Sequence, residues 1–297
     1  GRAEFFRGDV RSKDDWKKAL DGVDAVIHLA AYMDYHLDFS TYVKSNIESV
    51  ALLFELIVEK KLPIKKIVAA SSQSVYGDGK YNCPKCGIIY PPSRPESQLL
   101  ARKWEQLCHK CGAVAEPMPE LEDDVLSPQI PYGISKLTAE ELSVNLGKRY
   151  GVPAVSLRFS IVLGARQSFR HFYSGALRAF CVNVLSGEPI AMHEDGLQSR
   201  DFVSVHDAAR AHLLVLEDAH ADFNAFNIGS GEATKIIDLG KIVAEEAGVE
   251  FRPFLPGAFR VGGARHSHMS INKLKGLGWE PKVSLREMVR EYLLWLK

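Results

Sequence analysis

The chain has 297 residues, of which 46% are hydrophobic and 25% charged, a composition typical of globular proteins with a large core or two packed domains. Its 37 basic and 37 acidic residues cancel, so no net charge attracts a polyanion and we expect no nucleic-acid partner. No apolar run approaches the ~20 residues that a membrane span needs. Because the chain also opens without a signal peptide and is not cysteine-dense, we expect a cytoplasmic protein with no membrane partner.

The first half of the chain alternates strand-like apolar runs with helical patterns. We expect strands over residues 3–6, 24–29, 64–70 and 153–159, and helices over 12–20, 41–60 and 134–150. This alternation predicts a parallel sheet with helices on both faces, in which functional side chains collect at the carboxyl ends of the strands. The fold class is therefore α/β, with a Rossmann-type doubly wound sheet over residues 1–164.

The second half has shorter strands and a mixed pattern. Helices are expected over 206–218, 234–247 and 284–296, and we assign residues 165–297 to a smaller α/β lobe that can return strands to the main sheet. Residues 78–116 lack the α/β pattern altogether and are rich in proline, so we interpret them as an insertion into the first domain.

The insertion carries two pairs of cysteines, each with two residues between its members: Cys83, Cys86, Cys108 and Cys111. This spacing predicts a four-thiolate zinc site, and a site with four sulfur ligands is closed and structural rather than catalytic. A glycine follows the second cysteine of each pair and would relieve the tight turn around the sulfur atoms. The alternatives are two pairs of free thiols or a redox disulfide. The fifth cysteine, Cys181, lies in an apolar helical stretch and is expected in the core.

Tyr132 and Lys136 stand four residues apart at the start of a predicted helix, so both side chains lie on one face. A neighbouring ammonium lowers the pKa of a phenol, which would suit Tyr132 to take a proton from an alcohol. Ser72 follows the strand over 64–70 and could bind the oxygen that loses this proton. The pattern alone is weak, because a solvated lysine beside an interface tyrosine gives the same letters. Asn46 is a mediocre helix former within 41–60 and is either a surface residue or part of this site.

Several short motifs occur together in an order typical of one family. The stretches are Gly8-Asp9-Val10, His28-Leu29-Ala30-Ala31, Asn46, Ser71-Ser72, Val75-Tyr76-Gly77, Pro131-Tyr132-Gly133, Ser135-Lys136, Leu157-Arg158-Phe159, Arg200-Asp201-Phe202-Val203, Asn227-Ile228-Gly229-Ser230-Gly231 and Leu277-Gly278-Trp279-Glu280-Pro281. Outside the insertion, the chain resembles the extended short-chain dehydrogenase/reductases, in the group of NAD-dependent nucleotide-sugar epimerases and dehydratases.

This resemblance implies roles for individual residues. It implies a catalytic set of Tyr132, Lys136, Ser72 and Asn46, in which Tyr132 is the base and acid. It implies NAD as cofactor, bound by Asp9, Val10, Leu29, Ala30, Ala31, Tyr132 and Lys136. It implies a nucleotide-sugar substrate, contacted by Arg200, Arg265, Ser74, Arg166 and Gln167. Two guanidinium groups that converge on a diphosphate match its oxygens well, although a surface ion pair is the alternative for each arginine.

Departures from the family pattern narrow the expected reaction. Dehydratases of the family have an acidic pair where this chain has Gln73 and Ser74, so elimination of water is disfavoured. We therefore expect an NAD-dependent 4-epimerase that acts through a transient 4-keto intermediate, on a dTDP- or UDP-hexose. The alternatives are a reductase or dehydratase of the same fold, or a non-catalytic protein that binds partners through its zinc ribbon. Ile161 stands where the family often has a substrate-contacting asparagine. With its insertion and the segment 173–175, the chain resembles bacterial dTDP-L-rhamnose 4-epimerases.

The family's usual first strand and Gly-rich turn, which hold the pyrophosphate of the cofactor, are not found near residue 1. The first apolar segment instead matches the third strand of the family. We therefore expect weak or no NAD binding by the chain as given, and a reaction that belongs to a longer protein. Family members commonly pair two helices from each subunit, so we expect a homodimer through helices 41–60 and 134–150. The alternative is that both apolar faces only cover the sheet of their own subunit.

Overall fold

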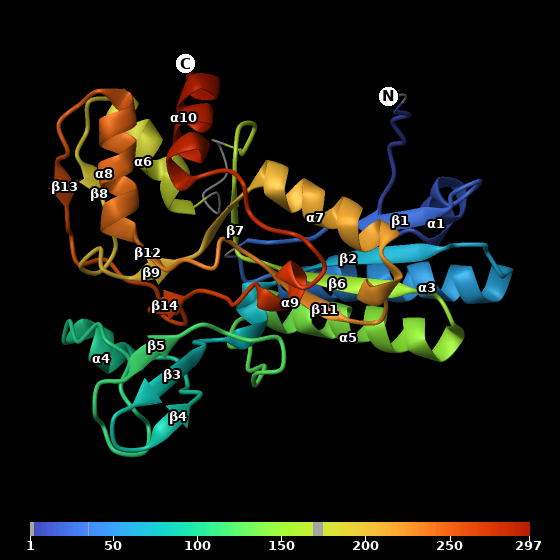
Figure 1. Ribbon diagram of the computed structural model, residues 1–297, viewed down its shortest axis with the longest axis horizontal. Coiled ribbons are helices and arrows are strands. Elements are labelled where there is room, and N and C mark those ends of the chain that lie inside the picture. The colour runs from blue at the N-terminus through green and yellow to red at the C-terminus, as the bar shows by residue number, and fades with distance from the viewer. Residues whose placement is uncertain (1–2, 35, 169–174) are drawn as a thin grey trace.

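The computed structural model describes residues 3–34, 36–168 and 175–297 (Figure 1). At its centre is a four-stranded parallel sheet in the order β1-β2-β6-β11, formed by β1 (Ala25–His28), β2 (Lys66–Ser72), β6 (Ala154–Phe159) and β11 (Ala225–Ile228). β1 is the edge strand among the described residues. The predicted Rossmann-type α/β fold is confirmed, and β11 brings a strand from the C-terminal half into this sheet.

Helices cover both faces of the sheet, as Figure 1 shows, with α7 above the strands and α3 and α5 below them. Alternate residues of β2 point to opposite faces: Ile67 joins the core under α3 (Ser49–Lys60) and α5 (Pro131–Tyr150), whereas Val68 joins the core under α7 (Val205–Glu217). A side-chain period of two produces this division. The unbroken apolar run of β2 thus reflects burial on both faces, which is typical of parallel sheets.

The long helix expected over 41–60 is composed of three parts. The chain passes without a break from α2 (Phe39–Tyr42) through a π-helical turn, η1 (Val43–Glu48), into α3. The short helix expected near residue 12 is α1 (Lys13–Ala19), and Ser12 begins it by accepting a hydrogen bond from the Asp15 amide at 3.2 Å. A short 3-10 helix, η2 (Gln73–Tyr76), follows β2 directly.

The prediction of a strand over residues 3–6 is wrong, because these residues form no strand in the structure. Phe5 and Phe6 are 89% and 47% exposed, so the apolar pattern does not correspond to a buried strand here. The segment pairs with no strand among the described residues, and an isolated extended segment gains no ladder hydrogen bonds.

The C-terminal lobe is formed around α6 (Gly175–Leu185), α8 (Ile236–Ala247) and α10 (Leu285–Leu296), which share one apolar core. Cys181 is fully buried in this core, as expected. The other short elements after β6 are β7 (Ile161–Leu163), β8 (Ile190–Ala191), β9 (Ser199–Arg200), β10 (Phe202–Ser204), β12 (Thr234–Lys235), β13 (Pro253–Phe254) and β14 (His266–Ser267). Two more, η4 (Ala219–Ala221) and α9 (Asn272–Lys275), add Ala221 and Leu274 to the core of the central sheet.

The insertion has a small antiparallel sheet of its own, in the order β4-β3-β5, and a short helix. Its elements are β3 (Lys80–Cys83), β4 (Gly87–Ile89), α4 (Glu96–Leu100) and β5 (Glu116–Met118). In Figure 1 the insertion projects from the end of β2 and lies beside β9 and β14 of the lobe. Among the described residues, none of the helices combines the length and the apolar character that crossing a bilayer requires.

Candidate active site

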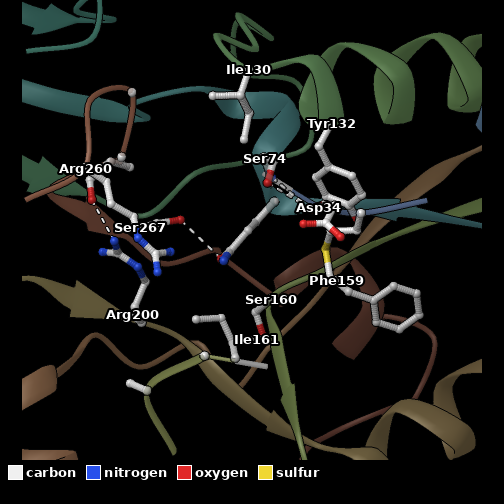
Figure 2. Close-up of a pocket in the computed structure, with 18 of the residues that line it drawn as sticks. Asp34, Ser74, Ile130, Tyr132, Phe159, Ser160, Ile161, Arg200, Arg260 and Ser267 are labelled. Carbon is white, nitrogen blue, oxygen red and sulfur yellow. Dashed lines mark hydrogen bonds between the residues drawn. The ribbon is translucent and has the colours of Figure 1, made fainter. Parts of the chain in front are cut away.

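A cavity of about 1400 Å³ lies between the carboxyl ends of the sheet and the C-terminal lobe. Its walls come from the segments after β1, β2 and β6, from the start of α5, and from lobe segments that include 191–202 and 260–267. Figure 2 shows Tyr132 on one side of this cavity and Arg200 and Arg260 on the other. The placement agrees with the general rule that parallel α/β sheets bind ligands at their carboxyl edge.

Ser72, Tyr132 and Lys136 meet at the floor of the cavity, which all three line. Ser72 is the last residue of β2, and its hydroxyl shares a hydrogen bond with the Tyr132 side chain. Lys136 lies one helical turn further along α5 and is 4% exposed. Its ammonium donates a 2.6 Å hydrogen bond to the Ala70 carbonyl. The end of one strand and the first turns of one helix thus place all three side chains.

Burial raises the pKa of Tyr132 to about 12, and the hydrogen bond to Ser72 only partly opposes this shift. Burial lowers the pKa of Lys136 to about 8. The expectation that the ammonium lowers the pKa of the phenol is therefore not met in this structure. The reason is that the ammonium points to the Ala70 carbonyl, and both groups lose water where charge is costly.

The turn after β2 and the start of α5 approach each other very closely at Gly133. A Cβ atom at this position would lie 2.6 Å from the Ser74 carbonyl oxygen and 3.0 Å from Pro128. Ser74 itself donates its amide to the Ser72 hydroxyl oxygen at 3.1 Å, within the turn that η2 forms. Glycine is required here because only a hydrogen atom fits between the two backbones. This contact sets the distance between the Ser72 and Tyr132 segments.

Asn46 connects three segments of the site from within the π-helical turn. Its side-chain amide donates to the Ser135 hydroxyl at 2.8 Å and to the Tyr32 carbonyl at 3.0 Å, and its oxygen accepts from the Tyr32 amide at 2.6 Å. With 2% exposure, it is no surface asparagine. Since Ser135 precedes Lys136 on α5, Asn46 holds the loop after β1 against the start of this helix.

The two arginines expected to bind the diphosphate have different surroundings. Arg200 lines the cavity, and its guanidinium donates to the carbonyls of Ser199, Ala264 and Arg265, with no carboxylate partner among the described residues. Arg265 is fully buried and forms ion pairs with three carboxylates, at 2.7 Å to Glu105 and Asp195 and 2.8 Å to Glu194. The structure therefore does not place Arg265 where a diphosphate could meet it, because its donors are already occupied.

The residues expected to bind the cofactor are only partly brought to the cavity. Leu29 and Ala31, after the edge strand β1, line it, whereas Ala30, Asp9 and Val10 are not among its described lining residues. The Asp9 carboxylate accepts hydrogen bonds from the Arg11 guanidinium, which lower its pKa to about 2.

Among the other substrate residues, Ser74 and Gln167 line the cavity and Arg166 does not; Arg166 is exposed and has a left-handed backbone, with φ 69°. Residues 173 and 174 of the segment 173–175 lie outside the described residues. Sequence reasoning missed two further arginines that line the cavity, Arg178 and Arg260. Neither stands in a recognisable motif, so only the fold could bring them to the site.

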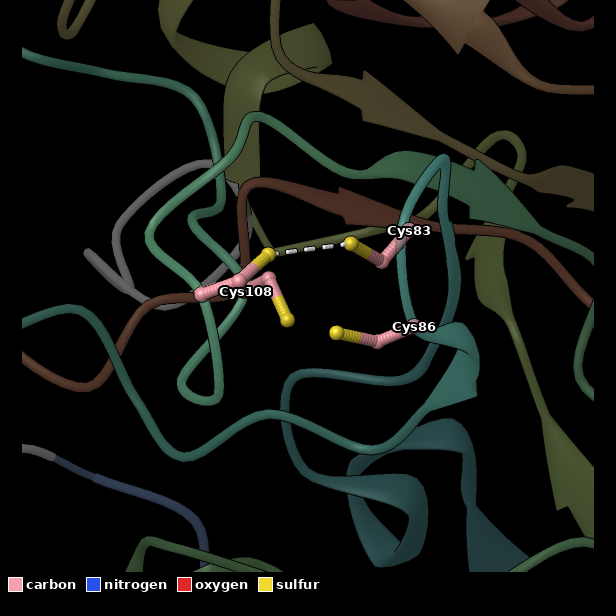
Figure 3. A group of neighbouring side chains, drawn as sticks. Cys83, Cys86 and Cys108 are labelled. Atoms are coloured by element: carbon pink, nitrogen blue, oxygen red, sulfur yellow. Dashed lines mark hydrogen bonds between the residues drawn. The ribbon is translucent and has the colours of Figure 1, made fainter.

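The four cysteines of the insertion form a cluster (Figure 3). Their sulfur atoms all lie within 4.8 Å of one another, with 3.5 Å between Cys83 and Cys111. Tetrahedral zinc with Zn–S bonds of about 2.3 Å needs sulfur atoms about 3.8 Å apart, so the cluster fits this ion. The glycines that follow the two pairs, Gly87 and Gly112, have φ of 71° and 75°, as expected for tight turns around a metal.

Comparisons with known proteins identify the family. Residues 1–98 and 108–229 match the pattern of the NAD dependent epimerase/dehydratase family. The chain belongs to this family. Residues 99–107, within the insertion, and residues 230–297 lie outside the match. The gap at 99–107 interrupts the matched region and marks these residues as a local addition to the family's pattern.

Named relatives and solved structures agree with this assignment. The chain is 30% identical to dTDP-L-rhamnose 4-epimerase of Burkholderia thailandensis, over 99% of the chain and 81% of that protein. Among solved structures, it is similar to UDP-glucuronic acid 4-epimerase from Bacillus cereus in complex with UDP-glucuronic acid and NAD, with TM-score 0.78, 25% identity, and coverage of 99% and 81%. It is also similar to UDP-glucose 4-epimerase from Thermotoga maritima with UDP-glucose, with TM-score 0.77, 26% identity, and coverage of 99% and 84%.

Proposed function

We propose that the protein is an NAD-dependent nucleotide-sugar 4-epimerase that acts through a transient 4-keto sugar. The observation that carries this proposal is the meeting of Ser72, Tyr132 and Lys136 on one floor of a cavity with an arginine-lined opposite wall. A phenol hydrogen-bonded to a serine can exchange a proton with a sugar hydroxyl. Relatives named as 4-epimerases of dTDP-L-rhamnose and of UDP-sugars support the same reaction, on a dTDP- or UDP-hexose.

The residues at the floor fit one part of a dinucleotide. The Lys136 ammonium has three N–H donors, and Ala70 is its only acceptor among the described residues, so two donors can reach ribose hydroxyls. Leu29 and Ala31 offer an apolar, accessible strip beside it. The chemistry that NAD would supply when held by these residues is reversible hydride transfer with a carbon of the sugar. The remaining cofactor contacts that we propose are Asp9, Val10 and Ala30.

Each residue of the floor has a separate task in this proposal. Tyr132 takes the proton of the sugar hydroxyl and later returns it. Ser72, already hydrogen-bonded to Tyr132, orients the sugar oxygen. Because burial raises the pKa of Tyr132 to about 12, loss of its proton needs positive charge near the phenol, which Lys136 and a bound cationic ring would supply together.

Arg200 is the arginine that we propose for the diphosphate. It lines the cavity without a carboxylate partner among the described residues, and burial lowers its pKa, so an incoming anion would relieve an unfavourable charge. Ser74 and Gln167 share this cavity and would contact the sugar or nucleotide. Elimination of water is disfavoured, because Gln73 and Ser74 at the floor are neutral and cannot act as acid or base.

The metal and the assembly complete the proposal. Cys83, Cys86, Cys108 and Cys111 would hold one structural zinc ion, which a metal analysis of the purified protein can measure. A reducing, cytoplasmic setting would keep these thiols available. Exposed apolar side chains on helices 41–60 and 134–150, among them Val43 and Ile134, support a homodimer through these helices, which light scattering can test.

The decisive experiment follows the product. The protein, in a form that retains NAD, is incubated in D₂O with UDP-, dTDP- and GDP-hexoses, and the sugars are analysed by NMR. We expect one of them to yield its C4 epimer without deuterium at C4, because the hydrogen would leave and return within the site. Deuterium at the inverted carbon would indicate inversion by deprotonation instead, and a requirement for added NADPH would indicate a reductase.

A further inference from the structure

The wall segment, residues 257–267, forms one side of the cavity with little regular structure. It supplies six lining residues: Arg260, Val261, Gly262, Gly263, Ala264 and Ser267. Its only strand is β14, two residues long, and two of its lining residues are glycines. Backbone hydrogen bonds of a helix or a sheet therefore do little to hold it. A segment of this kind depends on its neighbours for a fixed shape.

The insertion supplies these neighbours along the whole wall segment. The Arg94 guanidinium donates to the Gly263 carbonyl at 2.9 Å, and the Trp104 ring contacts that of Phe259, with 6.3 Å between centroids. Near the start of the segment, the Arg102 guanidinium lies over Gly257, 3.1 Å from where a Cβ atom would be. These contacts join the insertion to the wall segment at Gly257, Phe259 and Gly263.

Ion pairs strengthen the contact between the insertion and the wall segment. Glu105 of the insertion accepts from the Arg265 guanidinium at 2.7 Å and pairs with His266 at 3.2 Å, both within the wall segment. Arg94 pairs with Glu194 of the lobe at 2.9 Å, and Glu194 also accepts from Arg265 at 2.8 Å. Arg94 is 2% exposed and Glu194 is its one carboxylate partner among the described residues, so removing Glu194 would leave the buried Arg94 charge uncompensated. Arg265 is fully buried and would keep Glu194 and Asp195 if Glu105 were removed, so loss of Glu105 weakens its pairing without abolishing it.

Glu194, which pairs with both Arg94 and Arg265, has a strained backbone. Glu194 adopts a left-handed backbone with φ 52°, and its amide donates to the Ala258 carbonyl at 2.7 Å. A non-glycine residue persists in this conformation only where its surroundings hold it there. Here the surroundings are Arg94 and Arg265, one from the insertion and one from the wall segment.

The insertion has too small a core to hold this arrangement by itself. Its cluster of buried residues comprises Tyr81, Cys83, Ile89, Cys108 and Ala115, so two of its five members are cysteines of the proposed metal site. Glu105 lies three residues before Cys108, and Gln98 donates to the Glu105 carbonyl at 2.8 Å. Metal binding to the four sulfur atoms would thus order the chain that presents Trp104 and Glu105.

We propose that the metal-bound insertion is a brace for the wall segment, which makes the nucleotide-sugar side of the cavity dependent on the metal while the catalytic floor is independent of it. This inference rests on the proposed function for the identity of the ligand. It goes beyond the family's pattern, because Arg102, Trp104 and Glu105 fall within residues 99–107, which that pattern does not match. Arg265 then serves as a positioning residue that holds the wall rather than as a diphosphate ligand.

The test measures hydrogen exchange in the wall segment and nucleotide binding, so it does not depend on catalytic turnover. Hydrogen exchange of a peptide covering 257–267 is compared between the zinc-loaded protein and protein stripped by a chelator under reducing conditions, with β2 as internal reference. Titration calorimetry with dTDP and UDP gives the nucleotide Kd for both forms. We expect exchange in the wall to rise at least tenfold on metal removal, the nucleotide Kd to rise by about tenfold, and β2 to be unchanged. Re-addition of zinc should reverse both changes.

A matched pair of variants separates the effect of the ion pairs on the wall segment from the effect of the metal. Glu105→Gln keeps the cysteines but removes the charge that meets Arg265, whereas Glu116→Gln changes an exposed carboxylate on β5 with no wall contact among the described residues. We expect Glu105→Gln to retain zinc, raise wall exchange and weaken nucleotide binding by a few-fold, and Glu116→Gln to resemble the parent.

Two outcomes would contradict the proposal that the insertion braces the wall segment. Wall exchange that stays the same without the metal would mean that the segment holds itself, and a looser wall with an unchanged nucleotide Kd would mean that the brace has no role in binding. If neither nucleotide binds the untreated protein, the proposed function fails, and the exchange measurement alone decides whether the brace exists.

Discussion

The two sides of the cavity are constructed in different ways. On the floor, Ser72, Tyr132 and Lys136 stand on a strand end and a 20-residue helix, so backbone hydrogen bonds fix their positions. The wall segment has one two-residue strand and is held by side chains of the insertion. The floor thus depends on backbone hydrogen bonds of regular elements, whereas the wall depends on side chains from another part of the chain. A substitution in the insertion can therefore alter the wall and leave the floor in place.

The largest expected effect is the loss of kcat that follows a substitution of Tyr132 on the floor of the cavity. Tyr132→Phe removes the proposed proton-transfer group and should lower kcat by about 10²–10⁴-fold, because general acid–base groups contribute effects of this size. The wall is untouched, so KM and nucleotide Kd should change little. Steady-state kinetics by NMR measures this, and Tyr150→Phe, at the exposed end of the same helix, is the matched control. Unchanged kcat in Tyr132→Phe would exclude the proposed mechanism.

A second prediction concerns the stability of the floor. Glu140 on α5 forms a buried ion pair with Arg158 on β6 at 2.6 Å, and Arg158 also donates to the Tyr76 hydroxyl at 2.7 Å. Glu140→Gln leaves a buried guanidinium without its carboxylate, which should lower the free energy of unfolding by about 3–5 kcal/mol.

Urea unfolding followed by circular dichroism measures this loss. The neighbouring Glu141→Gln, on the exposed side of α5, should change the free energy of unfolding by less than about 0.5 kcal/mol. If both variants lose the same stability, the floor does not depend on its buried ion pair, and the contrast between floor and wall becomes weaker.

The smallest effect is the response of the wall to pH. The hydrogen bond to His266 and the pairing with Arg265 lower the pKa of Glu105 from 4.5 to about 2. Because this pKa is lower in the folded state, the stabilising contribution is present above pH 4.5 and is lost as the pH falls towards 2. The Glu105 side chain is 43% exposed, so solvent reduces the contribution to about 0.5 kcal/mol or less.

Trp104 can report this change, because its ring contacts Phe259 of the wall. We expect its emission, obtained by subtracting that of the Trp104→Phe variant, to shift as the pH falls from about 4.5 to about 2, before the far-ultraviolet circular dichroism changes. A Trp104 signal that changes only together with global unfolding would mean that the wall does not loosen separately.

Regular elements and their caps could be predicted from the sequence. The Ser12 cap, the apolar run of β2 and the spacing of Tyr132 and Lys136 depend on neighbours in the chain, so local patterns were sufficient. The surroundings of Arg265 could not be predicted, because its carboxylate partners lie 70–160 positions away in the chain. The direction of the Tyr132 pKa shift was missed for a similar reason: spacing says nothing about burial or about the carbonyl that receives the Lys136 ammonium.

The π-helical turn at Val43–Glu48 makes the site sensitive to the length of the chain as well as to its composition. Deleting one residue there would convert the widened turn into ordinary α-helix and change the directions in which the side chains of the turn point. The amide of Asn46 would then swing away from Tyr32 or Ser135, since both cannot be reached from a narrower coil. An insertion–deletion scan of this helix would therefore tolerate changes near Lys60 far better than changes near Asn46.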